Sequence, residues 1–371
     1  MSSSRRASPA PGLAPRDLER LRELLCAMQD AIRSRVVAAR ASRSSDELAA
    51  VDAVTAADTI YRIDRVGEDA IVAWLEASWP RDWAVELVME GDDPDAPPPR
   101  VPRDARDEDV RFVCIVDPVD GTRSLMHDKR SAWTLAAVAP VAGASRGVAP
   151  PRLRDTVVAA MTELPPTKQT LADQVSAVRG AGRAGLRAVR VDVGSGARRP
   201  FELRPSTATD CRHGFASFAR FFPEGRALVA AFEESLWAQL YGADENGAPL
   251  VFDDQYICTG GQLYELLAGR DRMLGDLRPL AFAELGLAKP ITCHPYDACT
   301  ALVLEEAGCR VTAPFGGPLD FPLDTTSPVA WVGFANAAIE AHVRPALDAC
   351  LARFFPRAAQ ARAANVIGSE P

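Results

Sequence analysis

The 371-residue sequence has no uninterrupted apolar run that reaches membrane-spanning length. Its first residues, MSSSRRASPAPGLAPRD, contain no apolar core of a secretory signal. Its eight cysteines are scattered, and no two of them form a Cys-x-x-Cys pair. We therefore expect reduced, mostly buried thiols rather than a disulfide framework, in a soluble cytoplasmic protein with no membrane partner.

An excess of positive charge is also lacking. The chain has 42 lysines and arginines against 50 aspartates and glutamates, which gives a formal net charge of −8. Sequence-independent binding to nucleic acid depends on clustered basic residues, so a nucleic-acid partner is not expected. A phosphate-bearing ligand would have to be held locally, by metal ions or backbone amides.

The length and composition are those of an ordinary globular protein, with 47% hydrophobic and 25% charged residues. Residues 1–15 are rich in Ser, Pro, Ala and Arg and are expected to form a disordered tail. We expect one domain over residues 16–357, with an N-terminal lobe (about 16–200) and a C-terminal lobe (about 201–357). Residues 358–371 are expected to be a second tail.

Apolar periodicity predicts helices and strands intermixed along the chain. Apolar residues recur at helical spacing from Leu18 to Val36, and again from Ala57 to Trp79. Short apolar runs predict strands at 83–90, 111–117 and 132–141, and residues 296–311 read as a helix followed by a strand. No internal repeat is visible. The fold class expected is mixed α/β (α+β), in layers.

The segment DPVDGT, residues 117–122, ends the second of these apolar runs with two acids. Two carboxylates this close repel each other and cost several kcal/mol to desolvate, so the segment is either a surface turn or a metal site. Mg²⁺ prefers oxygen ligands, and Asp117, Asp120 and the carbonyl of Val119 could supply them. Gly121 allows a sharp turn, after which the amides of Gly121 and Thr122 could face a phosphate.

Four segments together resemble the inositol monophosphatase family, within the superfamily that includes the fructose-bisphosphatases. They are DAVTAAD (52–58), LVMEG (87–91), DPVDGTRSLMH (117–127) and YDACTALVLEEAGCRV (296–311), and they occur in the family's order. The resemblance covers residues 16 to 355, nearly the whole chain. It implies the layered αβαβα sandwich of the sugar phosphatases, and homodimers are common in the family.

The resemblance also implies a metal-dependent phosphatase with two or three Mg²⁺ ions. Glu90, Asp117 and the Val119 carbonyl would hold the first ion, and Asp117, Asp120 and Asp297 the second. Thr122, hydrogen-bonded to Asp58, would orient and deprotonate the attacking water. The catalytic residues would thus be Asp58, Thr122 and Glu90, with substrate contacts from Gly121, Thr122, Asp120 and Arg123.

Other interpretations of single residues stay open at this stage. Asp58 could be an acid favoured by a helix dipole, Asp297 a helix cap and Glu90 a surface acid. Cys293 and His294 lack a second cluster at zinc spacing, so a zinc site is rejected. The segment SFARFF (217–222) reads as core or interface packing.

The sequence departs from the family on the substrate side. Gly91 replaces an acid, CTGG (258–261) replaces Gly-Ser-Ala, and Pro290 stands where inositol-type enzymes carry a substrate-contacting acid. Arg123 could reach an anionic group, as could Arg270 or Arg272. The metal ligands are retained while the substrate wall is altered.

These observations are compatible with three alternative functions. The first is a Mg²⁺-dependent phosphomonoesterase that hydrolyses a small sugar, polyol or inositol phosphate by metal-activated water. The second is a phosphatase for a sugar bisphosphate or a nucleoside 3′,5′-bisphosphate. The third, of a different class, is a non-catalytic metal- or phosphate-binding regulator.

Overall fold

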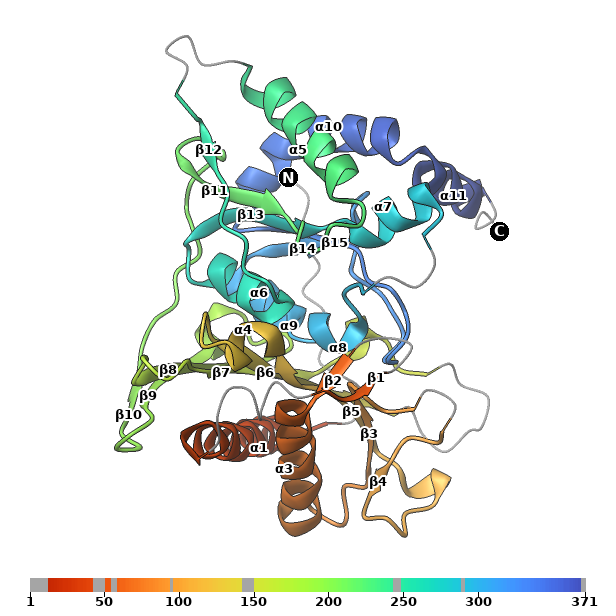
Figure 1. Cartoon of the computed structure of the whole chain (residues 1–371). Coiled ribbons are helices and arrows are strands. Elements are labelled where there is room, and N and C mark those ends of the chain that lie inside the picture. Colours follow the sequence, from red (N-terminus) through yellow and green to blue (C-terminus); the bar gives the residue numbers. More distant parts are fainter. Residues whose placement is uncertain are drawn as a thin grey trace.

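The computed structural model describes residues 13–367, apart from 43–50, 55–58, 94–95, 142–149, 243–247 and 288–290. Its helices and sheets stack in five layers, so the expected αβαβα sandwich and the mixed α/β fold class are confirmed (Figure 1). Within the described residues, no helix is long and apolar enough to cross a membrane.

The larger sheet has eight strands in the order β10-β9-β8-β7-β6-β5-β3-β4. Their bounds are β3 Val85–Met89, β4 Arg100–Val101, β5 Phe112–Asp120, β6 Ala132–Pro140, β7 Val158–Leu164, β8 Leu171–Val178, β9 Arg187–Asp192 and β10 Arg198–Pro200. All neighbours are antiparallel except β3 and β5, which run parallel. Helices α1 (Pro15–Ser42) and α3 (Arg62–Ser78) cover one face (Figure 1).

The smaller sheet has five strands in the order β12-β11-β13-β15-β14. These are β11 Gly214–Phe218, β12 Val251–Phe252, β13 Asp271–Asp276, β14 Arg310–Thr312 and β15 Trp331–Phe334. Between the sheets lie α4 (Thr122–Met126), α6 (Thr259–Leu267), α8 (Pro295–Ala298) and α9 (Ala301–Ala307) (Figure 1). The outer layer holds α5 (Arg226–Tyr241), α7 (Arg278–Leu285), α10 (Ala337–Phe354) and α11 (Pro356–Ile367).

Burial explains why these sequences form these elements. Strand β5 is buried at all nine positions, as expected for a central strand covered on both faces. Helix α1 places Leu21, Leu25 and Met28 against the sheet with no exposed surface. The buried Gln29 on the same helix donates to the carbonyls of Thr134 and Ala160, so its amide is satisfied inside the core.

Several element boundaries differ from the sequence expectation. The second helix begins at Arg62 rather than Ala57, because β2 (Thr59–Tyr61) pairs with β1 (Val51–Val54) just before it. Strands β7 to β10 continue the sheet beyond the strand expected at 132–141. Helix α11 occupies most of the segment that was expected to be a C-terminal tail, because its start packs beside α10 and α7. Residues 1–12 lie outside the described part of the chain.

Candidate active site

The acids of the DPVDGT segment stand at the end of strand β5, where the pairing with β6 is irregular. Asp117 pairs with Leu135 and Asp120 with Trp133, and the register shifts between these two pairs. Such a bulge changes the direction in which side chains point, and bulges are frequent beside active sites. Asp117 and Asp120 thereby face the space between the two sheets rather than opposite faces of one sheet.

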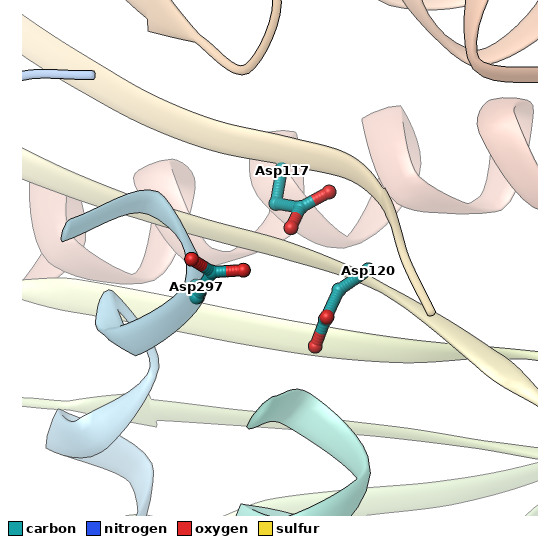
Figure 2. A group of neighbouring side chains, drawn as sticks. All are labelled: Asp117, Asp120 and Asp297. Carbon is teal, nitrogen blue, oxygen red and sulfur yellow. The ribbon is translucent and has the colours of Figure 1, made fainter. Parts of the chain in front are cut away.

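Three carboxylates converge at this point. Asp117 and Asp120 come from β5 and Asp297 comes from α8, and Figure 2 shows their carboxylates turned toward one another. One oxygen from each lies within 4.8 Å of the others. Asp117 is 1% and Asp120 7% exposed, so these charges are largely removed from water. Glu90, directly after β3, lines the same cavity.

Burial and mutual repulsion both act on these acids. Burial, followed by the charges of Glu90, Asp120 and Asp297, raises the pKa of Asp117 well above its usual value. Burial raises the pKa of Asp120 to about 7, although hydrogen bonds from the Gly260 amide and the Cys258 thiol oppose the shift. A cluster that resists ionisation in this way would be stabilised as carboxylates by a bound cation.

Local hydrogen bonds hold each carboxylate in place. Asp117 Oδ1 accepts from the Val119 amide at 2.9 Å, and Asp297 Oδ2 accepts from the His294 amide at 2.6 Å. Asp120 Oδ2 accepts from the Gly260 amide at the start of α6. A Cβ at position 260 would lie 2.9 Å from that same oxygen, so glycine permits this close approach.

Gly121 has φ +98°, and a Cβ there would lie 3.1 Å from the Cys258 side chain. The backbone therefore turns sharply at this position, as the sequence predicted. The turn places Thr122 at the start of α4, two residues after Asp120.

The donor set fits a hard divalent cation. Carboxylate oxygens from Asp117, Asp120 and Asp297 are available, and Glu90 and Val119 line the same cavity. Such all-oxygen sets suit Mg²⁺ rather than a thiophilic ion. Among the described residues, the only group with this geometry is Asp117, Asp120 and Asp297. The roles of Glu90 and Val119 as metal ligands remain predictions.

Thr122 makes a contact that the sequence did not predict. Its hydroxyl lies 2.6 Å from Asp64 Oδ1 and 2.7 Å from the Val119 carbonyl oxygen. A hydroxyl has one proton to donate, and a carboxylate is a stronger acceptor than a backbone carbonyl. The hydroxyl of Thr122 therefore donates to Asp64. Asp64 is 5% exposed, and its other oxygen accepts from the Tyr61 amide at 2.7 Å, which fixes its orientation.

Asp58, the expected partner of Thr122, lies outside the described residues, so its role stays a prediction. Asp64 was missed because the helix was expected to begin at Ala57, which would have placed Asp64 in its second turn. It is in fact the third residue of α3, where an acid caps the helix N-terminus. The available signal was an acid directly after Ile63, in the first turn of the apolar repeat of Ile63 and Ile71.

The remaining walls of the cavity combine aromatic rings and two arginines. Arg123 lies on one side, with its guanidinium carbon 5.7 Å from the Tyr61 ring centre and 5.9 Å from that of Phe222. Phe221 and Phe222 line the cavity. In the segment SFARFF, which was expected to serve packing, Phe218 is buried in the core and the last two rings line the cavity.

The arginines proposed from the sequence behave differently from one another. Arg123 lines the cavity, whereas Arg270 and Arg272 are not among its lining residues. Arg270 pairs with Glu265 at 2.8 Å, and Arg272 donates to the carbonyl of Asp210 at 3.2 Å. A different arginine, Arg278, lines the cavity, although it belongs to none of the sequence motifs.

We expect the metal-free protein to lose stability as the pH rises from about 4 to about 7. In the folded chain the pKa of Asp120 is raised by burial from 3.8 to about 7. Between these values the folded chain keeps a proton that the unfolded chain has lost. Each pH unit then lowers the free energy of unfolding by up to about 1.4 kcal/mol for this group.

Urea unfolding in the presence of EDTA measures this slope. The Asp120→Asn variant should show a shallower decrease than the unsubstituted protein over the same pH range. Equal slopes for the two proteins would contradict the raised pKa of Asp120.

Comparisons with known proteins find likeness at the level of structure alone. No protein-family model matches the sequence, and no curated protein matches it. Fructose-1,6-bisphosphatase of Leishmania major, in its holo form, aligns with a TM-score of 0.62 and 14% identity over 91% of this chain and 95% of that chain.

Two further solved structures have the same architecture. The extragenic suppressor protein SuhB of Bartonella henselae aligns with a TM-score of 0.56 and 17% identity, covering 88% of this chain and 98% of that chain. A proposed sedoheptulose-1,7-bisphosphatase of Toxoplasma gondii aligns with a TM-score of 0.62 and 15% identity, covering 91% and 99% respectively. The protein therefore has the fold of these bisphosphatase and SuhB structures, as its resemblance to the sugar phosphatases implied.

Proposed function

We propose that this protein is a Mg²⁺-dependent phosphomonoesterase that hydrolyses a small sugar, polyol or inositol phosphate. The observation that carries the proposal is the convergence of Asp117, Asp120 and Asp297 in one cavity, beside the Thr122–Asp64 hydrogen bond. The fold shared with sugar phosphatases supports it. Bound Mg²⁺ would activate a water molecule as the nucleophile and stabilise the leaving oxygen.

The chain's own residues would orient that water and take its proton. Thr122 lines the cavity, and its hydroxyl oxygen, while donating to Asp64, would accept a hydrogen bond from that water. Asp64 is the nearest carboxylate through which a proton could leave by way of Thr122. Glu90, which lines the same cavity, would help to hold this water beside the metal. Asp58 remains a second proposed partner of Thr122.

Three finer features of the proposal come from the family resemblance. They are the binding of two or three Mg²⁺ ions per site, the formation of a homodimer and a cytoplasmic location. Isothermal titration with Mg²⁺ measures the number of ions, and light scattering coupled to size exclusion measures the oligomeric state. A monomer at micromolar concentration would contradict the proposed dimer without affecting the proposed activity.

Phosphate release is the direct test. We expect the purified protein to release phosphate from some members of a panel of sugar, polyol and inositol phosphates, and only when Mg²⁺ is present. Chelation by EDTA should remove the activity and added Mg²⁺ should restore it. A folded protein that binds Mg²⁺ but releases no phosphate from any panel member would overturn the proposal in favour of a non-catalytic binding role.

A further inference from the structure

Arg278 is a buried cation in the wall of the cavity that holds the three acids. It is the first residue of α7 and is 6% exposed. It contributes to the same cavity as Asp117, Asp120 and Asp297. A buried arginine requires charge pairing and hydrogen bonds, and the structure provides both.

Asp276 fixes the guanidinium group in one orientation. Arg278 Nε lies 3.0 Å from both carboxylate oxygens of Asp276, and Nη2 lies 2.5 Å from Oδ2. Nη1 donates to the carbonyl of Ile291 at 3.2 Å. Asp276 itself is fully buried, so this bidentate pair is shielded from water and rigid.

The pairing leaves part of the guanidinium group available. Arginine has five N–H bonds, and within the described residues these hydrogen bonds use one on each of the three nitrogens. One N–H on Nη1 and one on Nη2 are left. These two N–H groups remain available to donate charged hydrogen bonds to a carboxylate or phosphate.

Two aromatic rings hold the plane of Arg278 beside the cavity. Its guanidinium carbon lies 5.0 Å from the ring centre of Phe221 and 5.5 Å from that of Phe222. Arg123 lies 5.9 Å from the centre of the same Phe222 ring. Two arginines therefore approach one ring in the cavity wall, and an anionic group near Phe222 would meet both positive charges.

We propose that Arg278, held by Asp276, Phe221 and Phe222, is a specificity-determining residue that binds a second anionic group on the substrate. This inference rests on the proposed phosphatase function. The substrate class is then a phosphate ester that carries a further phosphate or carboxylate. The phosphate to be hydrolysed lies at the acids, and the second anion lies at the arginine side of the same cavity.

The test compares matched pairs of substrates that differ by one anionic group. Fructose 1-phosphate is paired with fructose 1,6-bisphosphate, and glycerol 2-phosphate with 2-phosphoglycerate. The first pair adds a phosphate and the second adds a carboxylate, so the two pairs distinguish the source of the anion. For each pair, the ratio of kcat/KM values for the substrate with and without the added anion is measured in Mg²⁺.

We expect Arg278→Met to lower this ratio by about 100-fold for the pair that the protein prefers, because the charged hydrogen bonds to the second anionic group are lost. The loss should appear mainly in KM. Arg278→Lys keeps the positive charge but not the fork, and should lower the ratio by about 10-fold. It also serves as the second variant if the unpaired buried Asp276 prevents Arg278→Met from folding. Arg270→Met, an arginine outside the cavity, is the matched control and should leave the ratio unchanged.

The outcomes separate the inference from the function beneath it. If the unsubstituted protein released phosphate neither from the four compounds nor from any other panel member, the proposed function would be contradicted. Release with a ratio near one in both pairs, or equal losses on both members of each pair in the Arg278 variants, would overturn the role of Arg278 while leaving the phosphatase intact.

Discussion

Asp117→Asn should reduce Mg²⁺-dependent phosphate release by a factor on the order of 10³ or more, because it removes a charged ligand at the centre of the acid cluster. Asp117 is the most buried of the three acids, and the charges of Glu90, Asp120 and Asp297 all act on it. Asparagine has nearly the same shape and can still accept from the Val119 amide. The loss would therefore come from charge rather than from altered packing.

The same substitution should make the metal-free protein more stable. Burial and the neighbouring acids raise the pKa of Asp117, which means that its ionised form is unfavourable in the folded chain. Asparagine removes that cost, and we expect the free energy of unfolding in EDTA to rise by about 1–2 kcal/mol. Stabilisation by added Mg²⁺ should decrease at the same time. Opposite effects on stability and activity are characteristic of a binding site and not of a structural residue.

Thermal unfolding with EDTA and with Mg²⁺, together with phosphate release, measures all three effects. Asp82→Asn, at an exposed aspartate outside the cavity, is the matched control and should change none of them. If Asp117→Asn destabilised the metal-free protein by several kcal/mol, the acid would have a structural role, and the assignment as a metal ligand would lose its main support.

Asp64→Asn is expected to lower kcat by about 10²- to 10³-fold with little change in KM. The carboxylate accepts from the Thr122 hydroxyl at 2.6 Å, and an amide is a much weaker proton acceptor. Removing a general base typically costs a factor of about 10²–10⁴ in rate. Asparagine keeps an oxygen for the Tyr61 amide, so the cap of α3 should be retained and stability should change by no more than about 1 kcal/mol.

Asp58→Asn is the informative comparison, because the sequence motif assigns to Asp58 the role that the contact with Thr122 supports for Asp64. The measurement is the steady-state kcat of Asp58→Asn, Asp64→Asn and Thr122→Val. We expect Asp64→Asn and Thr122→Val to lose kcat to a similar extent. A normal kcat in Asp64→Asn with a large loss in Asp58→Asn would contradict our assignment and return Asp58 to the catalytic role.

The sequence by itself determined the parts of this protein that depend on local pattern. The apolar repeat between Leu18 and Val36 specified α1, because one helix face must be buried. The run before Asp117 specified the central strand β5, because only a strand covered on both faces is apolar throughout. The motifs that end β5 and begin α8 were enough to predict that Asp117, Asp120 and Asp297 converge, as they do.

Only the tertiary structure decided which other residues share the cavity. Phe222 and Arg278 lie far from the acids in sequence, and no local period distinguishes them from residues of the core. They meet because the two sheets stack with α6 and α8 between them (Figure 1). The Thr122–Asp64 contact joins residues 58 positions apart and depends on where α3 begins. Long-range packing sets such contacts, whereas a sequence pattern reports only which face of an element is buried.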